Sequence, residues 1–403
     1  MDDEMTDPNS NGRAKKDQGQ APHFAALDSI RGIAALSVAL YHMSWTSVVE
    51  GQNYIRNSYL VVDLFFVLSG FVIFYAYRAR IRAASDAVRF MWLRFWRLYP
   101  LHFTFLVVFL LIECLKGFVE WRFGLVANHP AFSTNNLYSF IGNLFLAQSL
   151  HIYNHITFNY PSWSISVEFY TYFVFAIVVL LSNGTRAILT MAALIAAASF
   201  GGLIYRGFTV LGDTNDFAII RCLTGFFIGV LTFAFYEHWH NRAKSNSRAR
   251  LTSWLTLIVL TGFACYLEFK HRGVSDFAIY PISAALVLMV ALSASKGPMK
   301  FLGSAPFVWL GTVSYSIYMV HASVEWGVAQ FLRFVMHTKQ AQLPYHDTPV
   351  LEPNAFAGIL ATMVYVLIVL LLSHFTYTRI EKPLRDWSKS FWRTKQSAKV
   401  APP

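Results

Sequence analysis

The chain has 403 residues, of which 55% are hydrophobic, 17% are aromatic and only 14% are charged. A water-soluble domain carries more charge and fewer large apolar side chains, so this composition excludes an ordinary soluble protein. The net charge of +11 comes from Lys and Arg in short segments between apolar blocks, which is the positive-inside pattern of membrane proteins and argues against nucleic-acid binding.

Apolar blocks of about 20 residues recur along the chain, and such blocks predict helices that cross a bilayer. The fold class expected is therefore an all-α polytopic membrane protein. We expect residues 1–24 to be a disordered cytoplasmic tail, 25–386 to be the membrane domain, and 387–403 to be a basic cytoplasmic tail. The predicted helices, in chain order, are 25–46, 58–77, 98–115, 137–150, 163–182, 186–205, 217–236, 252–268, 277–295, 307–334 and 355–378.

Basic segments predict the orientation of these helices. Residues 78–97 and 237–250, the pair Lys296 and Lys300, and the end of the chain after 378 are all expected in the cytoplasm. For 78–97 and 237–250 to share a side, only three crossings can lie between 137 and 236. The shortest block, 137–150, precedes the polar sequence HIYNHITFNYP, so we predict that 137–162 does not cross. About ten transmembrane helices then place both termini in the cytoplasm.

Ionisable residues in the first apolar block suggest a functional cavity. Arg31 and His42 are eleven residues apart, about three helical turns, so both fall on one stripe about 16 Å apart. Charged groups in a span usually face a bundle interior or a wet cavity. Arg31 could hold an anion and His42 could take a proton near neutral pH. The alternatives are an Arg31 that reaches the cytoplasmic interface and a His42 that only packs.

Several short motifs extend this observation, and together they resemble the acyltransferase-3 family of integral membrane acyltransferases. Arg31, ten intervening residues and His42 resemble the motif of its first helix. The likeness runs from about residue 25 to 386. The other matching segments are DLFFVLSGFVIF (63–74), RFWRLYP (94–100), PSWSISVEFYTYF (161–173), GTVSYSIYMVH (311–321) and EKP (381–383).

The resemblance implies transfer of an acyl group, usually acetyl from cytoplasmic acetyl-CoA, to a carbohydrate or glycolipid hydroxyl at the membrane. It also implies an integral protein of a bacterial cytoplasmic (inner) membrane. No permanently bound cofactor is expected, because acetyl-CoA is the acyl donor. His42 would act either as general base on the acceptor hydroxyl or as a transient acyl carrier. The catalytic residues expected are His42, Arg31 and Glu168.

Arg94 and Arg97 are the residues expected to bind the donor. They are three residues apart, so they are neighbours on a helical face, and two guanidinium groups suit the phosphates of CoA. The alternative is a pair that only anchors the helix at the cytoplasmic interface. Glu168 is expected in the outer half of the membrane, at the depth of His42. The family often has a second acidic residue after this Glu, whereas Phe169 follows here.

Three further residues were assigned to substrate binding: Asp63, Tyr315 and His321. Asp63 begins a predicted span, where it could also cap the helix or pair with a cation. Tyr315 and His321 lie in one predicted span, where packing is the alternative to a direct role. Glu381 and Lys382 end the last span before Pro383, which we interpreted as architecture.

Two other functions stay open from sequence. A secondary transporter could use Arg31, His42 and Glu168 as a substrate or proton pathway, although the internal repeats common in transporters are not evident. The chain could also pass acyl groups to a separate accessory soluble transferase. A metal site is not expected, because the two histidines of HWH (238–240) do not share a helical face and lack further ligands.

Overall fold

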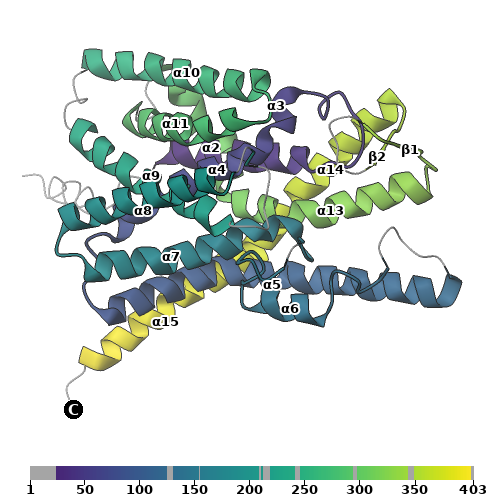
Figure 1. The fold of residues 1–403 in the computed structure, drawn as a ribbon, viewed down its shortest axis with the longest axis horizontal. Helices are drawn as coiled ribbons and strands as arrows, with labels where there is room; N and C mark the ends of the chain where they lie inside the picture. The colour runs from purple at the N-terminus through teal and green to yellow at the C-terminus, as the bar shows by residue number, and fades with distance from the viewer. Residues whose placement is uncertain are drawn as a thin grey trace, which may run out of the picture.

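The computed structural model describes residues 24–124, 130–153, 155–207, 210–211, 218–240, 246–293, 297–343 and 349–400. Within these residues the fold is a bundle of helices with one small two-stranded sheet (Figure 1). The predicted tail 1–23 and the basic residues Arg242, Lys244 and Lys296 lie outside the described residues. The predicted all-α class is confirmed.

The first half of the fold runs from α2 to α8. Its elements are α2 (Ala25–Tyr41), α3 (Asn53–Arg56), η1 (Ser58–Leu60), α4 (Val61–Tyr77), α5 (Ala84–Phe123), α6 (Leu137–Leu144), η2 (Tyr160–Ser162), α7 (Trp163–Leu181) and α8 (Thr185–Tyr205). The second half runs from α9 to α15. Its elements are α9 (Ala218–His240), α10 (Asn246–Phe269), η4 (Val274–Ala278), α11 (Ile279–Ser293), η5 (Gly297–Gly303), α12 (Ala305–Thr312), α13 (Ser314–Phe334), β1 (Gln340–Ala341), β2 (Val350–Leu351), α14 (Ala355–Thr376), the π-helical turn η6 (Tyr377–Glu381) and α15 (Lys382–Val400).

Eight helical segments among the described residues are long and apolar enough to cross a membrane, which makes the chain a polytopic membrane protein. The 17 residues of α2 fall just short of that length and rise about 26 Å, close to the hydrocarbon thickness of a bilayer. The predicted total of ten and the cytoplasmic location of the termini stay predictions. The eight segments are Ser58–Tyr77, Ala84–Phe123, Tyr160–Leu181, Thr185–Tyr205, Ala218–His240, Leu251–Phe269, Val274–Ser293 and Ala355–Trp392.

Most predicted helices differ from the observed ones in their bounds, and three of these differences have a clear cause. The first ends at Tyr41 rather than 46, because the following chain turns and pairs with β2 through Trp45 and Leu351. The third, predicted as 98–115, is the 40-residue α5, because the Arg-rich stretch before it is also made of good helix formers. The block 307–334 is two helices that break at Val313.

The segment predicted not to cross contains the short helix α6. Its eight residues rise about 12 Å, far less than the thickness of a bilayer core. The side chain of Asn136 caps its start by accepting a hydrogen bond from the backbone N–H of Ser139 at 3.0 Å. The structure therefore agrees with the prediction for 137–150.

Glycines let the central helices approach one another closely. A Cβ atom at Gly70 of α4 would lie 1.8 Å from the carbonyl oxygen of Phe226 in α9, and one at Gly229 would lie 2.0 Å from that of Val67. The same holds where α2 crosses α12, because a Cβ atom at Gly311 would lie 2.2 Å from the carbonyl oxygen of Asp28. Small residues at such crossings permit the backbone contact that stabilises membrane bundles.

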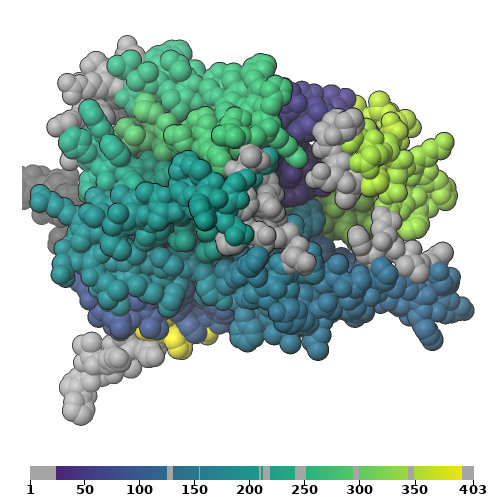
Figure 2. All heavy atoms as spheres, viewed as in Figure 1, coloured from purple at the N-terminus to yellow at the C-terminus, as the bar shows by residue number. Residues whose placement is uncertain are grey.

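The C-terminal segment predicted as a basic tail is helical where it is described. It forms most of α15, which lies along the first half of α5 (Figure 1). Trp387 packs edge-on against Trp96, with ring centroids 4.8 Å apart, and Phe391 stacks on Trp92 at 5.2 Å. The far end of α5 instead projects away from the rest of the bundle (Figure 2).

Candidate active site

A cavity of about 190 Å³ lies among α2, α4, α5, α7 and α13. It contains five of the residues that the sequence singled out: Arg31, Arg94, Arg97, Glu168 and Tyr315. These residues come from four helices, and the fold brings them to one space. The remaining polar lining is Ser69, Ser164, Tyr172, Ser314 and Tyr318, and the apolar lining is Val62, Phe65, Phe66, Val72, Ile73, Leu98 and Ile165.

Two of the three arginines in the cavity have carboxylate partners. Arg31 donates to Asp28, one turn earlier on α2, at 3.0 Å. Arg97 forms an ion pair with the buried carboxylate of Glu381 and lies over the ring of Tyr315, with the guanidinium carbon 5.1 Å from the ring centroid. The side chains of Arg31 and Arg97 are 27% and 22% exposed, so both stand at an open part of the cavity.

Arg94 is held differently. Its guanidinium donates to the hydroxyl of Tyr77 at 3.3 Å and lies over the rings of Tyr77 and Phe90. Its Nε atom is buried and has no hydrogen-bond partner among the described residues. Of the three arginines, Arg94 is the one with no carboxylate partner among the described residues, so its charge is the least compensated before a ligand binds.

Glu168 enters this cavity from the first turns of α7. One of its oxygens, Oε1, accepts hydrogen bonds from the hydroxyls of Ser69 and Tyr172, each at 2.6 Å. In the described part of the chain no hydrogen bond reaches the other oxygen, Oε2. Glu168 shares a cavity with the arginines, because it meets α4 at Ser69, in the middle of that helix. Its depth in the membrane relative to His42 stays a prediction.

Glu381, which the sequence analysis interpreted as architecture, has a specific role in holding Arg97. The π-helical turn η6 places it between Arg97 and the hydroxyl of Ser316, which donates to Oε2 at 2.9 Å. Nη1 of Arg385 lies 3.7 Å from Oε1 of the same carboxylate. π-Helical turns are rare and often occur at functional sites. The sequence signal that could have revealed this contact is the position of Glu381, an acid at the start of the basic C-terminal segment.

His42 lies outside the cavity lining and caps the C-terminal end of α2. Its Nδ1 atom is 3.1 Å from Nε2 of His321 in α13. The ring of Tyr160 is 4.8 Å from that of His42, centroid to centroid. The stripe predicted to join Arg31 and His42 stays a prediction: Arg31 lines the cavity, whereas His42 lies just past the end of α2 and contacts His321.

Tyr318 connects the cavity with the two histidines. Tyr318 lines the cavity. The centroid of its ring lies 6.2 Å from that of Phe65 and 5.8 Å from that of His321. Its hydroxyl accepts a hydrogen bond from Ser164 at 2.8 Å. The end of the cavity is therefore one side chain away from the contact between His321 and His42.

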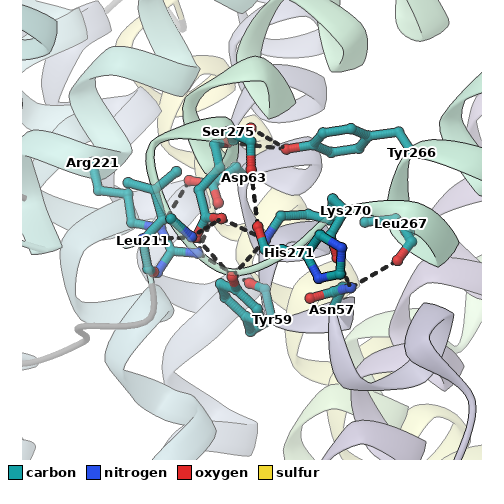
Figure 3. Close-up of polar contacts among 12 residues, drawn as sticks. Asn57, Tyr59, Asp63, Leu211, Arg221, Tyr266, Leu267, Lys270, His271 and Ser275 are labelled. Atoms are coloured by element: carbon teal, nitrogen blue, oxygen red, sulfur yellow. Dashed lines mark hydrogen bonds and ion pairs between the residues drawn. The ribbon is translucent and has the colours of Figure 1, made fainter. Parts of the chain in front are cut away.

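Asp63 is not in the cavity. It is fully buried, and its two oxygens accept hydrogen bonds from Nε and Nη2 of Arg221 at 2.8 and 2.7 Å (Figure 3). The same cluster contains Tyr59, whose hydroxyl donates to Asp276 at 2.7 Å, and Lys270, which forms an ion pair with Asp276. The expected substrate contact of Asp63 is thus replaced by a closed ion pair. Sequence had left pairing with a cation open, but it did not identify Arg221.

Comparisons with known proteins identify the family of the whole chain. The family model of an acyltransferase domain (Acyl_transf_3) matches residues 24–377. ORF330 of Acidianus two-tailed virus, named as an acetyltransferase, is 25% identical over 310 residues, covering 74% of this chain and 82% of that protein. BcsY of Komagataeibacter xylinus, named as a membrane-bound transacylase, is 24% identical over 301 residues, covering 73% and 71%. The O-acetyltransferase OatA of Staphylococcus aureus is 22% identical over 385 residues, which are 90% of this chain and 57% of OatA.

Proposed function

Because the chain belongs to the acyltransferase-3 family, we propose that it moves an acyl group, acetyl in the first instance, from cytoplasmic acyl-CoA to a carbohydrate hydroxyl. The acceptor would be a cell-surface or exported glycan or glycolipid, and the membrane would be a bacterial inner membrane. The names of the matched relatives support acyl transfer within a membrane protein.

The proposal rests on the residues that line the cavity. They include Arg31, Arg94 and Arg97, and also Tyr318, whose ring lies next to that of His321. At about 190 Å³ the cavity is smaller than a typical pocket for a whole cofactor, so it fits the thioester end of the donor. The nucleotide end would stay at the open side, near the arginines. Charge-assisted hydrogen bonds from Arg94 would then hold phosphate or carbonyl oxygens of the donor.

The transfer itself needs a group that accepts a proton from the acceptor hydroxyl. In the direct route, the hydroxyl oxygen attacks the thioester carbonyl while His42 takes the hydroxyl proton. The carbon–sulfur bond then breaks, and the proton passes to the CoA thiolate. In the other route, a ring nitrogen of His42 attacks the thioester carbonyl and the carbon–sulfur bond breaks, which releases CoA thiolate. The acceptor hydroxyl then attacks the acyl carbon, the carbon–nitrogen bond breaks, and the hydroxyl proton passes to the thiolate. Both routes use the same nitrogen of His42.

Replacing His42 tests the proposal most directly. We expect His42→Ala to lower the transfer rate by roughly 10²–10⁴-fold while the protein still folds and inserts, because general-base help of that size is lost. The assay would follow the label of radioactive acetyl-CoA into cell-surface glycans of cells that lack the native gene. Mass spectrometry of O-acyl groups on those glycans would identify the acceptor. Near wild-type transfer by His42→Ala would remove the central claim.

A further inference from the structure

His321 is in a position to influence which nitrogen of His42 carries the hydrogen, together with the backbone carbonyl of Val38, which also interacts with the His42 ring. The ring of His321 is fully buried in α13. Its Nδ1 atom is 3.2 Å from the carbonyl oxygen of Ile317, one turn earlier. A carbonyl oxygen only accepts hydrogen bonds, so Nδ1 of His321 must carry a hydrogen. In the neutral ring, Nε2 of His321 is then an acceptor.

The consequence for His42 follows from the 3.1 Å contact between the rings. Because Nε2 of neutral His321 accepts, Nδ1 of neutral His42 must donate to it. The lone pair of His42 is then on Nε2. This is the nitrogen that either route of the proposed reaction requires, as base or as nucleophile.

Other ionisable groups around the pair do not make this contact. Tyr160 and Tyr41 contact the His42 ring, and Tyr318 contacts the His321 ring, through their aromatic faces and edges. The nearby carboxylate of Glu325, also in α13, accepts a hydrogen bond from Ser44. Tyr365 of α14 donates to the carbonyl of Ala39. Within the described residues no carboxylate is hydrogen-bonded to either imidazole.

We propose that His321 is a positioning residue, which fixes the His42 imidazole in the form with hydrogen on Nδ1 and the lone pair on Nε2. It takes the place of the carboxylate that orients the histidine in a Ser-His-Asp triad, but it is a neutral acceptor. This reassigns His321 from the substrate contact expected from sequence. The proposal rests on the proposed function only for the consequence that the lone pair is used in acyl transfer.

Two substitutions separate positioning from packing. In His321→Gln the amide oxygen is as many bonds from Cβ as Nε2 of histidine is, so it can accept from His42. His321→Leu fills similar space with no acceptor. His374→Leu is the matched control, because His374 is exposed on α14 and its Nδ1 accepts a hydrogen bond from Trp309, whereas no contact joins it to His42 or His321 among the described residues.

We expect His321→Leu to lower kcat for acyl transfer by roughly 10²–10⁴-fold, the range for loss of a correctly oriented base. The KM for acetyl-CoA should stay the same, because the arginines of the cavity are unchanged. His321→Gln should keep kcat within about tenfold of wild type. His374→Leu should match wild type. Equal loss in the Gln and Leu variants, or no loss in Leu, would overturn the proposal.

A second readout does not depend on acyl transfer. Nitrogen-15 NMR of histidine-labelled protein in lipid distinguishes a protonated from an unprotonated ring nitrogen, and His42→Gln identifies the His42 signals. Wild type and His321→Gln should show an unprotonated Nε2 at His42, and His321→Leu should lose that signal. The same His42 signals in all three proteins would overturn the proposal. If the wild type shows the expected signals but transfers no acyl group, positioning stands and the proposed function fails.

Discussion

Two clusters of buried charge lie within the same membrane bundle, and they are built on different rules. One is the ion-pair cluster of Asp63, Arg221, Lys270 and Asp276 (Figure 3). The other is the cavity that contains Arg31, Arg94, Arg97 and Glu168. Both bring arginine and acid together between helices. The second has a cavity beside the charges.

The ion-pair cluster is densely hydrogen-bonded. Arg221 gives hydrogen bonds to both oxygens of Asp63 and to the backbone carbonyls of Tyr59 and Leu211. Its side chain is 3% exposed, and that of Asp63 is fully buried. With four hydrogen bonds from Arg221 and both oxygens of Asp63 occupied, this ion pair joins helices and has little left to bind a ligand.

The cavity keeps unused capacity. Nε of Arg94 has no partner among the described residues, and both hydroxyls that reach Glu168 go to the same oxygen. Unsatisfied polar groups are costly in a membrane unless water or a ligand completes them. The comparison teaches that a buried charge marks a functional site in this bundle only where its hydrogen bonds are left incomplete beside a cavity.

The largest expected difference between the two clusters is in the free energy of unfolding. Arg221→Met leaves the buried carboxylate of Asp63 without its cation, so we expect a loss of about 3–5 kcal/mol in the free energy of unfolding. Arg94→Met, on the cavity side, should cost much less because no buried acid depends on it. Unfolding of the purified proteins in detergent measures both.

A double variant is the control for that interpretation. Asp63→Leu combined with Arg221→Met removes both charges and should be more stable than Arg221→Met alone. If Arg221→Met and Arg94→Met unfold alike, the two clusters do not differ in the way we describe.

The two clusters were also unequally predictable from the sequence. The spacing of Arg94 and Arg97 correctly placed them on one helical face, because local periodicity alone decides that. Arg221, the partner of Asp63, is 158 residues away in the chain, and no local pattern joins them. The contact of His42 with His321 is likewise set by helix packing. The contact of Glu168 with Ser69 could not be predicted either, because topology gives the side of the membrane, but not where α7 crosses α4.

The next effect concerns donor affinity. Arg94→Ala should weaken acetyl-CoA binding by roughly 10–100-fold, the range for one hydrogen bond to a charged group. Arg94→Lys should weaken it as well, since the point charge loses the guanidinium fork. Binding to purified protein in detergent measures this, with Arg82→Ala as the exposed control in the same basic segment. Unchanged affinity in Arg94→Ala would make Arg94 an interfacial anchor.

The smallest effect expected tests how Glu168 is prepared for a ligand. The hydroxyl of Ser69 donates to Oε1 of Glu168, and that of Tyr172 donates to the same oxygen, so Oε2 has no hydrogen bond from the described residues. Ser69→Ala removes one of two donors, and a single such bond contributes about 1 kcal/mol. We therefore expect kcat/KM for acyl transfer to fall about three- to tenfold, with the free energy of unfolding nearly unchanged.

Thr171→Ala is the control. Thr171 lies one turn after Glu168 on α7, and its buried hydroxyl donates to Cys222 and does not line the cavity. An equal loss of kcat/KM in both variants would show that Glu168 needs packing rather than this hydrogen bond, and would remove the distinction between the two clusters at that residue.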